Sequence, residues 1–196
     1  MTGLVALCSG SGAEVHTFAE PRYRGQLGGI GYTGGTVELD GADGVWVPEG
    51  TPRRRLAAHA AGLEALLERG GIVLLFGDHQ AGWPATVRWT YRPAGGAGDT
   101  ALPSTEHGFA AQVGSGARQL HHHGVLDPPA GADVLLAAPD GAAVAYLDRT
   151  STRGTLFVST LDPLAHYGLT NHADAARFLD AFLPWVTDTL LPGGHG

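Results

Sequence analysis

The sequence has very little cysteine and no long apolar run. Its single cysteine, Cys8, excludes an intramolecular disulfide and fits a reducing compartment. No apolar stretch approaches the roughly 20 residues needed to span a bilayer. The apolar residues from Leu4 to Cys8 are too few for a signal peptide, and no basic region precedes them. We therefore expect a cytoplasmic protein without membrane association.

Basic residues are also scarce. There are 12 Lys+Arg against 19 Asp+Glu, which gives a formal net charge of −7 and a pI of about 5.7. This balance argues against nucleic acid or an anionic membrane as a partner. The partner expected from the candidate site described below is a small-molecule ligand. A hydrophobic content of 43% over 196 residues is typical of one globular domain. We expect that domain to span residues 1–191, with a disordered tail over 192–196, and the sequence leaves homo-oligomerisation open.

Buried strands and one clear helix dominate the first half of the chain. Thr51 is a candidate N-cap and Pro52 suits the first helical position, while Gly70 and Gly71 are expected to end the helix. A strand, this helix and a further strand make a βαβ unit of parallel strands. Three buried strands are expected: the short apolar run Leu4–Cys8, the segment Asp43–Pro48, which proline ends, and the continuous apolar run Ile72–Phe76, typical of a strand buried on both faces.

The second half mixes exposed strands with a hairpin and a final helix. Glycine-rich segments predict loops over 25–35 and 94–103. The expected elements are a half-exposed strand over 86–92, a short helix within 106–113, a hairpin of 134–138 and 142–147, a strand over 156–160, and a helix from 171 that is disturbed at Pro184. Together these elements predict an α/β fold. We expect a flavodoxin-like three-layer sandwich with a mainly parallel central sheet and an added β-hairpin.

Two stretches resemble the class I glutamine amidotransferase-like superfamily, and within it the ThuA-like (trehalose-utilisation) branch. Residues 43–50, the following helix and residues 70–79 are similar to the family's second strand, its helix and the strand that enters the nucleophile elbow. Residues 154–162 and a final helix ending near Trp185 are similar to the closing strand and helix. The resemblance implies the flavodoxin-like fold and activity on a sugar or keto-sugar derivative.

The sequence departs from this family at the nucleophile. Phe76 stands where the family's cysteine would be, and Asp162-Pro163 stands where a His-Pro pair is expected. Cys8, at the end of the first strand, is no substitute by position. Because a thiolate nucleophile needs both its sulfur and an adjacent base, we expect no glutamine amidotransferase activity. The alternative to an enzyme is a non-catalytic ligand- or partner-binding module with the same fold.

Four polar residues follow the predicted parallel strands. Glu49, Asp78, His79 and Asp162 lie just past strand carboxyl ends, where open α/β sheets bind their ligands. Carboxylates and an imidazole in one cleft form a general acid–base set, so these four are the predicted catalytic residues. Taken singly, the aspartates could equally cap helices or brace turns.

The run His121-His122-His123 is the most unusual local feature. On an extended strand alternate side chains share a face, so His121 and His123 should point together. With a carboxylate and a third histidine, His166, from elsewhere in the chain, they predict a Zn²⁺, Mn²⁺ or Fe²⁺ site. Further candidate ligands are His107 and His172. The same run could instead line a pocket without metal, so the cofactor stays open between none and a divalent metal.

Arg53-Arg54-Arg55 lies in the first turn of the predicted helix, where positive charge opposes the helix macrodipole. We favour a solvated face for this run over a contact with a small anion. A sugar-stacking or anion-binding wall could be formed by Trp83, Trp89 and Tyr91 with Arg88 and Arg92. Aromatic residues on a half-exposed strand more often belong to the core.

Overall fold

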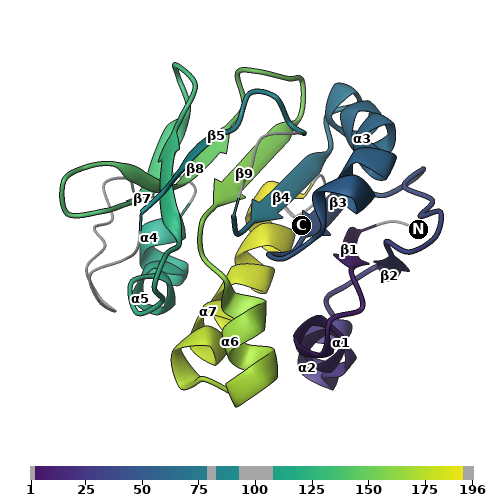
Figure 1. Cartoon of the computed structure of the whole chain (residues 1–196), viewed down its shortest axis with the longest axis horizontal. Helices are drawn as coiled ribbons and strands as arrows, with labels where there is room; N and C mark the ends of the chain where they lie inside the picture. Colours follow the sequence, from purple (N-terminus) through teal and green to yellow (C-terminus); the bar gives the residue numbers. More distant parts are fainter. Residues whose placement is uncertain (1–2, 79–82, 93–107, 192–196) are drawn as a thin grey trace.

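A nine-stranded sheet forms the centre of the computed structural model, which describes residues 3–78, 83–92 and 108–191 (Figure 1). The strand order is β2-β1-β3-β4-β9-β8-β6-β5, with β7 paired to β8. The parallel strands are β1 (Leu4–Cys8), β2 (Gly29–Tyr32), β3 (Gly44–Val47), β4 (Ile72–Phe76) and β9 (Thr155–Ser159). The antiparallel strands are β5 (Arg88–Tyr91), β6 (Gly124–Asp127), β7 (Asp133–Ala137) and β8 (Ala143–Asp148).

The parallel part of the sheet has flavodoxin-like connectivity. Its order β2-β1-β3-β4-β9 reverses direction between β1 and β3, which makes that point the topological switch where ligands bind. The hairpin β7–β8 adds antiparallel strands beyond β9. The predicted fold class is therefore confirmed.

Helices cover both faces of the sheet (Figure 1). Leu56, Leu63 and Leu66 of α3 (Arg53–Glu68) pack against one face, together with Val5 and Leu7 of β1. Residues Leu4 and Ala6 point to the opposite face, which explains why β1 is apolar throughout. The opposite face carries α1 (Gly12–Ala19), α2 (Pro21–Arg24), α4 (Phe109–Gln112), α5 (Gly114–Ala117), α6 (Pro163–Thr170) and α7 (Ala173–Trp185).

An aromatic cluster fills the core on the α7 side. Phe76 lies at its centre, with ring centroids 5.3 Å from Phe157 and 5.3 Å from Phe182. Trp46 also packs against Phe182 in an edge-to-face arrangement, with ring centroids 6.0 Å apart. Phe76 therefore belongs to the hydrophobic core.

Several local expectations were wrong. Thr51 does not cap α3, because Pro52 is the N-cap and the Thr51 hydroxyl donates to the Pro48 carbonyl at 2.8 Å. Segment 25–35 is not all loop: β2 forms there because its backbone pairs with β1. Helices α1 and α6 were not anticipated, although Ser11 and Glu14 provide the Ser-x-x-Glu spacing of a helix start.

The ends of the helices agree better with the sequence. Gly70 takes a positive φ of 88° after α3, as expected of a glycine that ends a helix. Pro184 lies inside α7, and a π-helical turn, Val186–Leu190, follows it. No helix among the described residues is both long and apolar enough to cross a bilayer. His79, His107, the 94–103 segment and the 192–196 tail lie outside the described residues.

Candidate functional site

A cleft of about 580 Å³ opens at the carboxyl edge of the parallel strands, at the switch point of the sheet. It is a typical size for a small-molecule site. The first turns of α1, α3 and α6 and the turns after β3 and β4 form its walls. The lining residues that matter below are Ser11, Glu49, Arg53, Asp78, His123 and Asp162.

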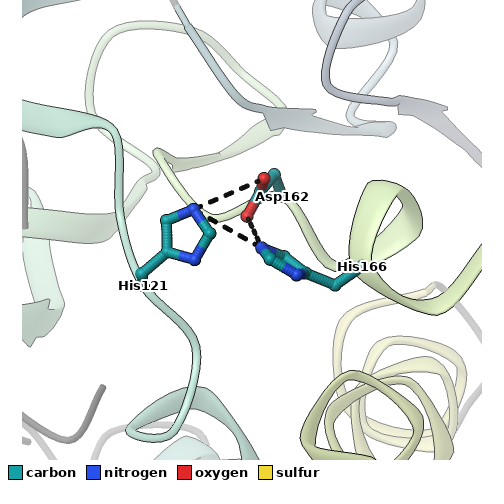
Figure 2. Close-up of side chains that lie close together, drawn as sticks. All are labelled: His121, Asp162 and His166. Carbon is teal, nitrogen blue, oxygen red and sulfur yellow. Dashed lines mark hydrogen bonds and ion pairs between the residues drawn. The ribbon is translucent and has the colours of Figure 1, made fainter. Parts of the chain in front are cut away.

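Three histidines surround Asp162 at one end of this cleft, and we call His121, His123, Asp162 and His166 the His–Asp cluster. Asp162 is the N-cap residue of α6, and His166 lies one helical turn further on, at i+4. Figure 2 shows the side chains of His121, Asp162 and His166 pointing toward one another.

Local pairing brings the histidine run to Asp162. His122 forms an antiparallel bridge with Leu161, and the His123 N–H donates to the Thr160 carbonyl at 3.2 Å. Because alternate side chains of an extended segment share a face, His121 and His123 both face Asp162. His122 points the other way, is 4% exposed, and its Nδ1 lies 3.1 Å from the Gly124 carbonyl.

The polar atoms of the cluster are close to one another. The Nε2 atom of His121 lies 2.9 Å from Nε2 of His123 and 3.4 Å from Nε2 of His166. Asp162 has Oδ2 at 3.0 Å from His123 Nε2 and 3.8 Å from His121 Nε2, while Oδ1 lies 3.2 Å from His166 Nε2. Ligand atoms of His121, Asp162 and His166 all fall within 4.8 Å of one another.

The cluster is half-buried. The Asp162 side chain is only 14% exposed, and its Oδ1 has no hydrogen bond of good geometry among the described residues. Burial lowers the pKa of His121, and the neighbouring imidazoles add to this effect while Asp162 opposes it. His121 is therefore held toward the neutral form, which is the form of imidazole that binds a metal.

Glu49 follows strand β3 and contacts the first turn of helix α6. Its Oε1 accepts a hydrogen bond from the Ala165 N–H at 2.8 Å, and its Oε2 is buried without a partner among the residues described. Burial raises the pKa of Glu49 to about 8, although hydrogen bonds from backbone N–H groups, Ala165 foremost, act in the opposite direction. Gly77, at φ +92°, packs so closely on Glu49 that a Cβ atom there would overlap it. Glu49 is thus a carboxyl group that stays protonated at neutral pH.

The structure brings together most of the residues that the sequence singled out. Glu49, Asp78 and Asp162 line one cleft, with Asp78 exposed at its rim. His172 lies beside the cluster, with its ring centroid 5.7 Å from that of His166. Its Nδ1 is 3.8 Å from Asp174 Oδ2.

The sequence favoured a solvated face for Arg53-Arg54-Arg55 over contact with an anion, but the structure places two of these arginines in cavities. Arg53 lines the cleft, and Arg54 lines a second cavity beside it. Arg55 donates to the Ser9 carbonyl at 2.5 Å. The unfavourable position of these charges at a helix start was the available signal.

Comparisons with known proteins identify the fold. Neither the scan against protein-family models nor the search of curated proteins gives a match. Among solved structures, a cytoplasmic protein of Salmonella typhimurium LT2 superposes with a TM-score of 0.63 at 11% identity, over 98% of this chain and 100% of that one. A glutamine amidotransferase of Thermotoga maritima gives a TM-score of 0.55 at 10% identity, over 92% of this chain and 90% of that one.

An exo-β-1,4-mannosidase of the Opitutaceae bacterium strain TAV5 also superposes, with a TM-score of 0.56 at 13% identity. The match covers 96% of this chain but only 36% of the mannosidase. At such low identities these likenesses define the fold and nothing more. The chain has the fold of glutamine amidotransferases, which confirms the resemblance at the level of the fold.

Proposed function

We propose that the chain is a divalent-metal-dependent enzyme that acts on a small polar molecule bound in the cleft. The observation that carries the proposal is the convergence of imidazole Nε2 atoms on the Asp162 carboxylate. His121, Asp162 and His166 are the proposed ligands, and His123 is a fourth group in contact with two of them.

The hydrogen-bonding capacity of imidazole supports a cation at this point. Each ring nitrogen offers one in-plane position, which carries either a proton or a lone pair. His121 Nε2 nevertheless has two polar neighbours, at 2.9 and 3.4 Å, and His166 Nε2 also has two, at 3.4 and 3.2 Å. One nitrogen cannot form a full hydrogen bond with both neighbours. A shared metal ion would accept all the lone pairs at once.

The spacing of the ligand atoms also suits a metal. A tetrahedral zinc with Zn–N bonds of about 2.0–2.1 Å separates its ligand atoms by roughly 3.3 Å. The contacts within the cluster run from 2.9 to 3.8 Å. Imidazole favours zinc and iron, and carboxylate adds affinity for manganese, so the three metals predicted from the sequence remain the candidates.

Glu49 supplies acid–base chemistry in the proposed reaction. A bound metal would act as a Lewis acid toward an oxygen of the bound molecule. Glu49, a protonated carboxyl group in the cleft lining, is the proposed proton donor, and Asp78 at the rim is the proposed acceptor. His79 stays a predicted acid–base residue.

Within the class of small polar molecules we propose a sugar or keto-sugar derivative, on the resemblance to ThuA-like proteins. Glutamine hydrolysis through a thiolate is not part of the proposal. Cys8 is 1% exposed, and burial raises the pKa of its thiol. Phe76 lies in the aromatic core, and the turn after β4 is made by Gly77, which has no side chain.

Metal content tests the proposal directly. Protein purified without a histidine tag is incubated with zinc, manganese or ferrous iron, desalted and measured by elemental mass spectrometry. We expect one metal ion per chain, lost in the His121→Ala/His166→Ala double variant. His16→Ala is the matched control, because His16 is exposed on α1 and contacts Asn171 rather than the cluster.

A second arm measures turnover of a panel of sugars and keto-sugars by the metal-loaded protein. Turnover that falls in the double variant and survives in His16→Ala supports an enzyme. Failure to bind any of the three metals would overturn the proposal and favour the alternative, a non-catalytic binding module.

A further inference from the structure

A second cavity continues the cleft away from the His–Asp cluster. Its volume is about 410 Å³, and it shares Gly50, Thr51, Arg53 and Asp78 with the first cavity. The two cavities therefore meet at the start of α3. A molecule held at the cluster could extend past Arg53 into the second cavity.

Two arginines without partners lie at this junction. Arg53 and Arg54 line the second cavity, and within the described ranges neither side chain has a hydrogen bond or ion pair. Arg55, the next residue, does have a partner, since it donates to the Ser9 carbonyl. The two free guanidinium groups are thus distinguished from their neighbour in both contact and position.

The position of these charges is unfavourable in the free protein. They lie in the first turn of a 16-residue helix, which has no acidic residue there and no side-chain cap. The helix macrodipole places partial positive charge at the same point, so the arginines are repelled by it. An anion would reverse this balance, because guanidinium groups bind oxyanions through paired N–H donors.

Apart from Thr51 and the carboxyl group of Asp78, the rest of the second cavity is largely apolar. Leu56 of α3 and Leu75 of β4 form part of its wall, and Trp83 closes one side. The Trp83 ring is held in place, since its Nε1–H donates to Glu64 Oε1 at 3.1 Å. This wall suits a ring or another flat, weakly polar group adjacent to the anion.

We propose that the second cavity is a substrate subsite that binds an oxyanion on Arg53 and Arg54 and an attached ring against Trp83 and Leu56. The subsite deepens the proposed function, on which it rests for the identity of the bound molecule as substrate. It assigns that molecule to the anionic small molecules, with either a phosphate or a carboxylate group. The reacting end would then lie at the His–Asp cluster.

Binding of simple probes tests the subsite without any knowledge of the reaction. Metal-free protein, prepared with a chelator, is titrated by calorimetry with phenyl phosphate, phenylacetate and the neutral 2-phenylethanol. We expect at least one anion to bind and the neutral probe to bind about tenfold more weakly or worse. The Arg53→Ala/Arg54→Ala variant should lose about tenfold or more in affinity for the anion.

Matched variants locate the effect. Arg88→Ala removes one guanidinium group, from an exposed position on β5 that lines neither cavity, and it should bind the anion like the parent. Quenching of tryptophan fluorescence by the bound probe should be lost in Trp83→Phe. Preference for phenyl phosphate or for phenylacetate identifies the oxyanion, and either preference supports the subsite.

Three results would overturn the subsite: no binding of either anion, equal affinity for the neutral probe, or equal affinity in the Arg53→Ala/Arg54→Ala variant. These outcomes are independent of the metal proposal, because the titration uses metal-free protein. Metal content of the double arginine variant should equal that of the parent. Binding of metal without binding of an anion would refute only the subsite. Binding of an anion without binding of metal would refute only the metal site.

Discussion

Replacing Glu49 by glutamine should stabilise the metal-free protein, and the gain should grow with pH. Glutamine keeps the shape of the side chain, and its carbonyl can still accept the Ala165 N–H that Glu49 Oε1 accepts at 2.8 Å. Unlike the carboxyl group, the amide never ionises. The variant therefore removes the cost of a buried acid without creating a cavity.

The sign of the effect follows from the two pKa values. The ordinary pKa of the carboxyl is 4.5, and burial raises the pKa in the folded protein to about 8. Below pH 4.5 the carboxyl group is protonated in both the folded and the unfolded chain, so its ionisation does not affect the free energy of unfolding. Between these values the unfolded chain releases a proton that the folded protein keeps, so the parent is destabilised by about 1.4 kcal/mol per pH unit. Over the whole interval the loss amounts to roughly 5 kcal/mol, after which it levels off.

Denaturant unfolding at several pH values between 4.5 and 8.5, with a chelator present and constant ionic strength, measures this difference. Histidines that titrate in the same range cancel when the variant is compared with the parent at each pH. Glu68→Gln, an exposed change on α3, is the control and should leave the free energy of unfolding unchanged at every pH. A difference between Glu49→Gln and the parent that does not vary with pH would refute the reasoning.

Other substitutions test the packing and the metal. Phe76→Cys should confer no glutaminase activity, because the new thiol would face the aromatic core, and it should lower the free energy of unfolding by about 3 kcal/mol. Glutamine hydrolysis by the variant would contradict this placement. Gly168→Val should lower the free energy of unfolding by about 2 kcal/mol or more, since any Cβ there overlaps the Ala13 backbone of α1. An unchanged midpoint in chemical denaturation would show that α1 and α6 can separate freely. Zinc at a hundredfold excess over its Kd should stabilise the parent by about 2.7 kcal/mol in thermal unfolding, and an equal gain in His166→Ala would argue against the proposed ligand set.

The local sequence predicted the elements that are buried on both faces. Strands β1, β3, β4 and β9 are apolar at consecutive positions because helices cover them on each side, and such runs are visible without a structure. The hairpin β7–β8 was predictable from its turn, in which Gly141 takes a positive φ of 88°.

Strand β2 could not be predicted in the same way. Two of its four residues are glycine, and its extended backbone is maintained by hydrogen bonds to β1. The start of α3 was also misplaced, since Thr51 bonds back to Pro48 rather than to the helix. In both cases a contact between segments decided the local conformation.

For the candidate site, too, local sequence and contacts between distant segments made separate contributions. The sequence alone determined the chemistry of this protein's site residues: an aspartate after a strand, a histidine four residues later, and a run of three histidines. Only the tertiary structure decided that these groups meet, because the bridge between His122 and Leu161 joins segments about 40 residues apart and turns His121 toward Asp162. It likewise decided that Arg53 and Arg54 face a cavity, since a helical pattern says which residues share a face but not what lies opposite that face.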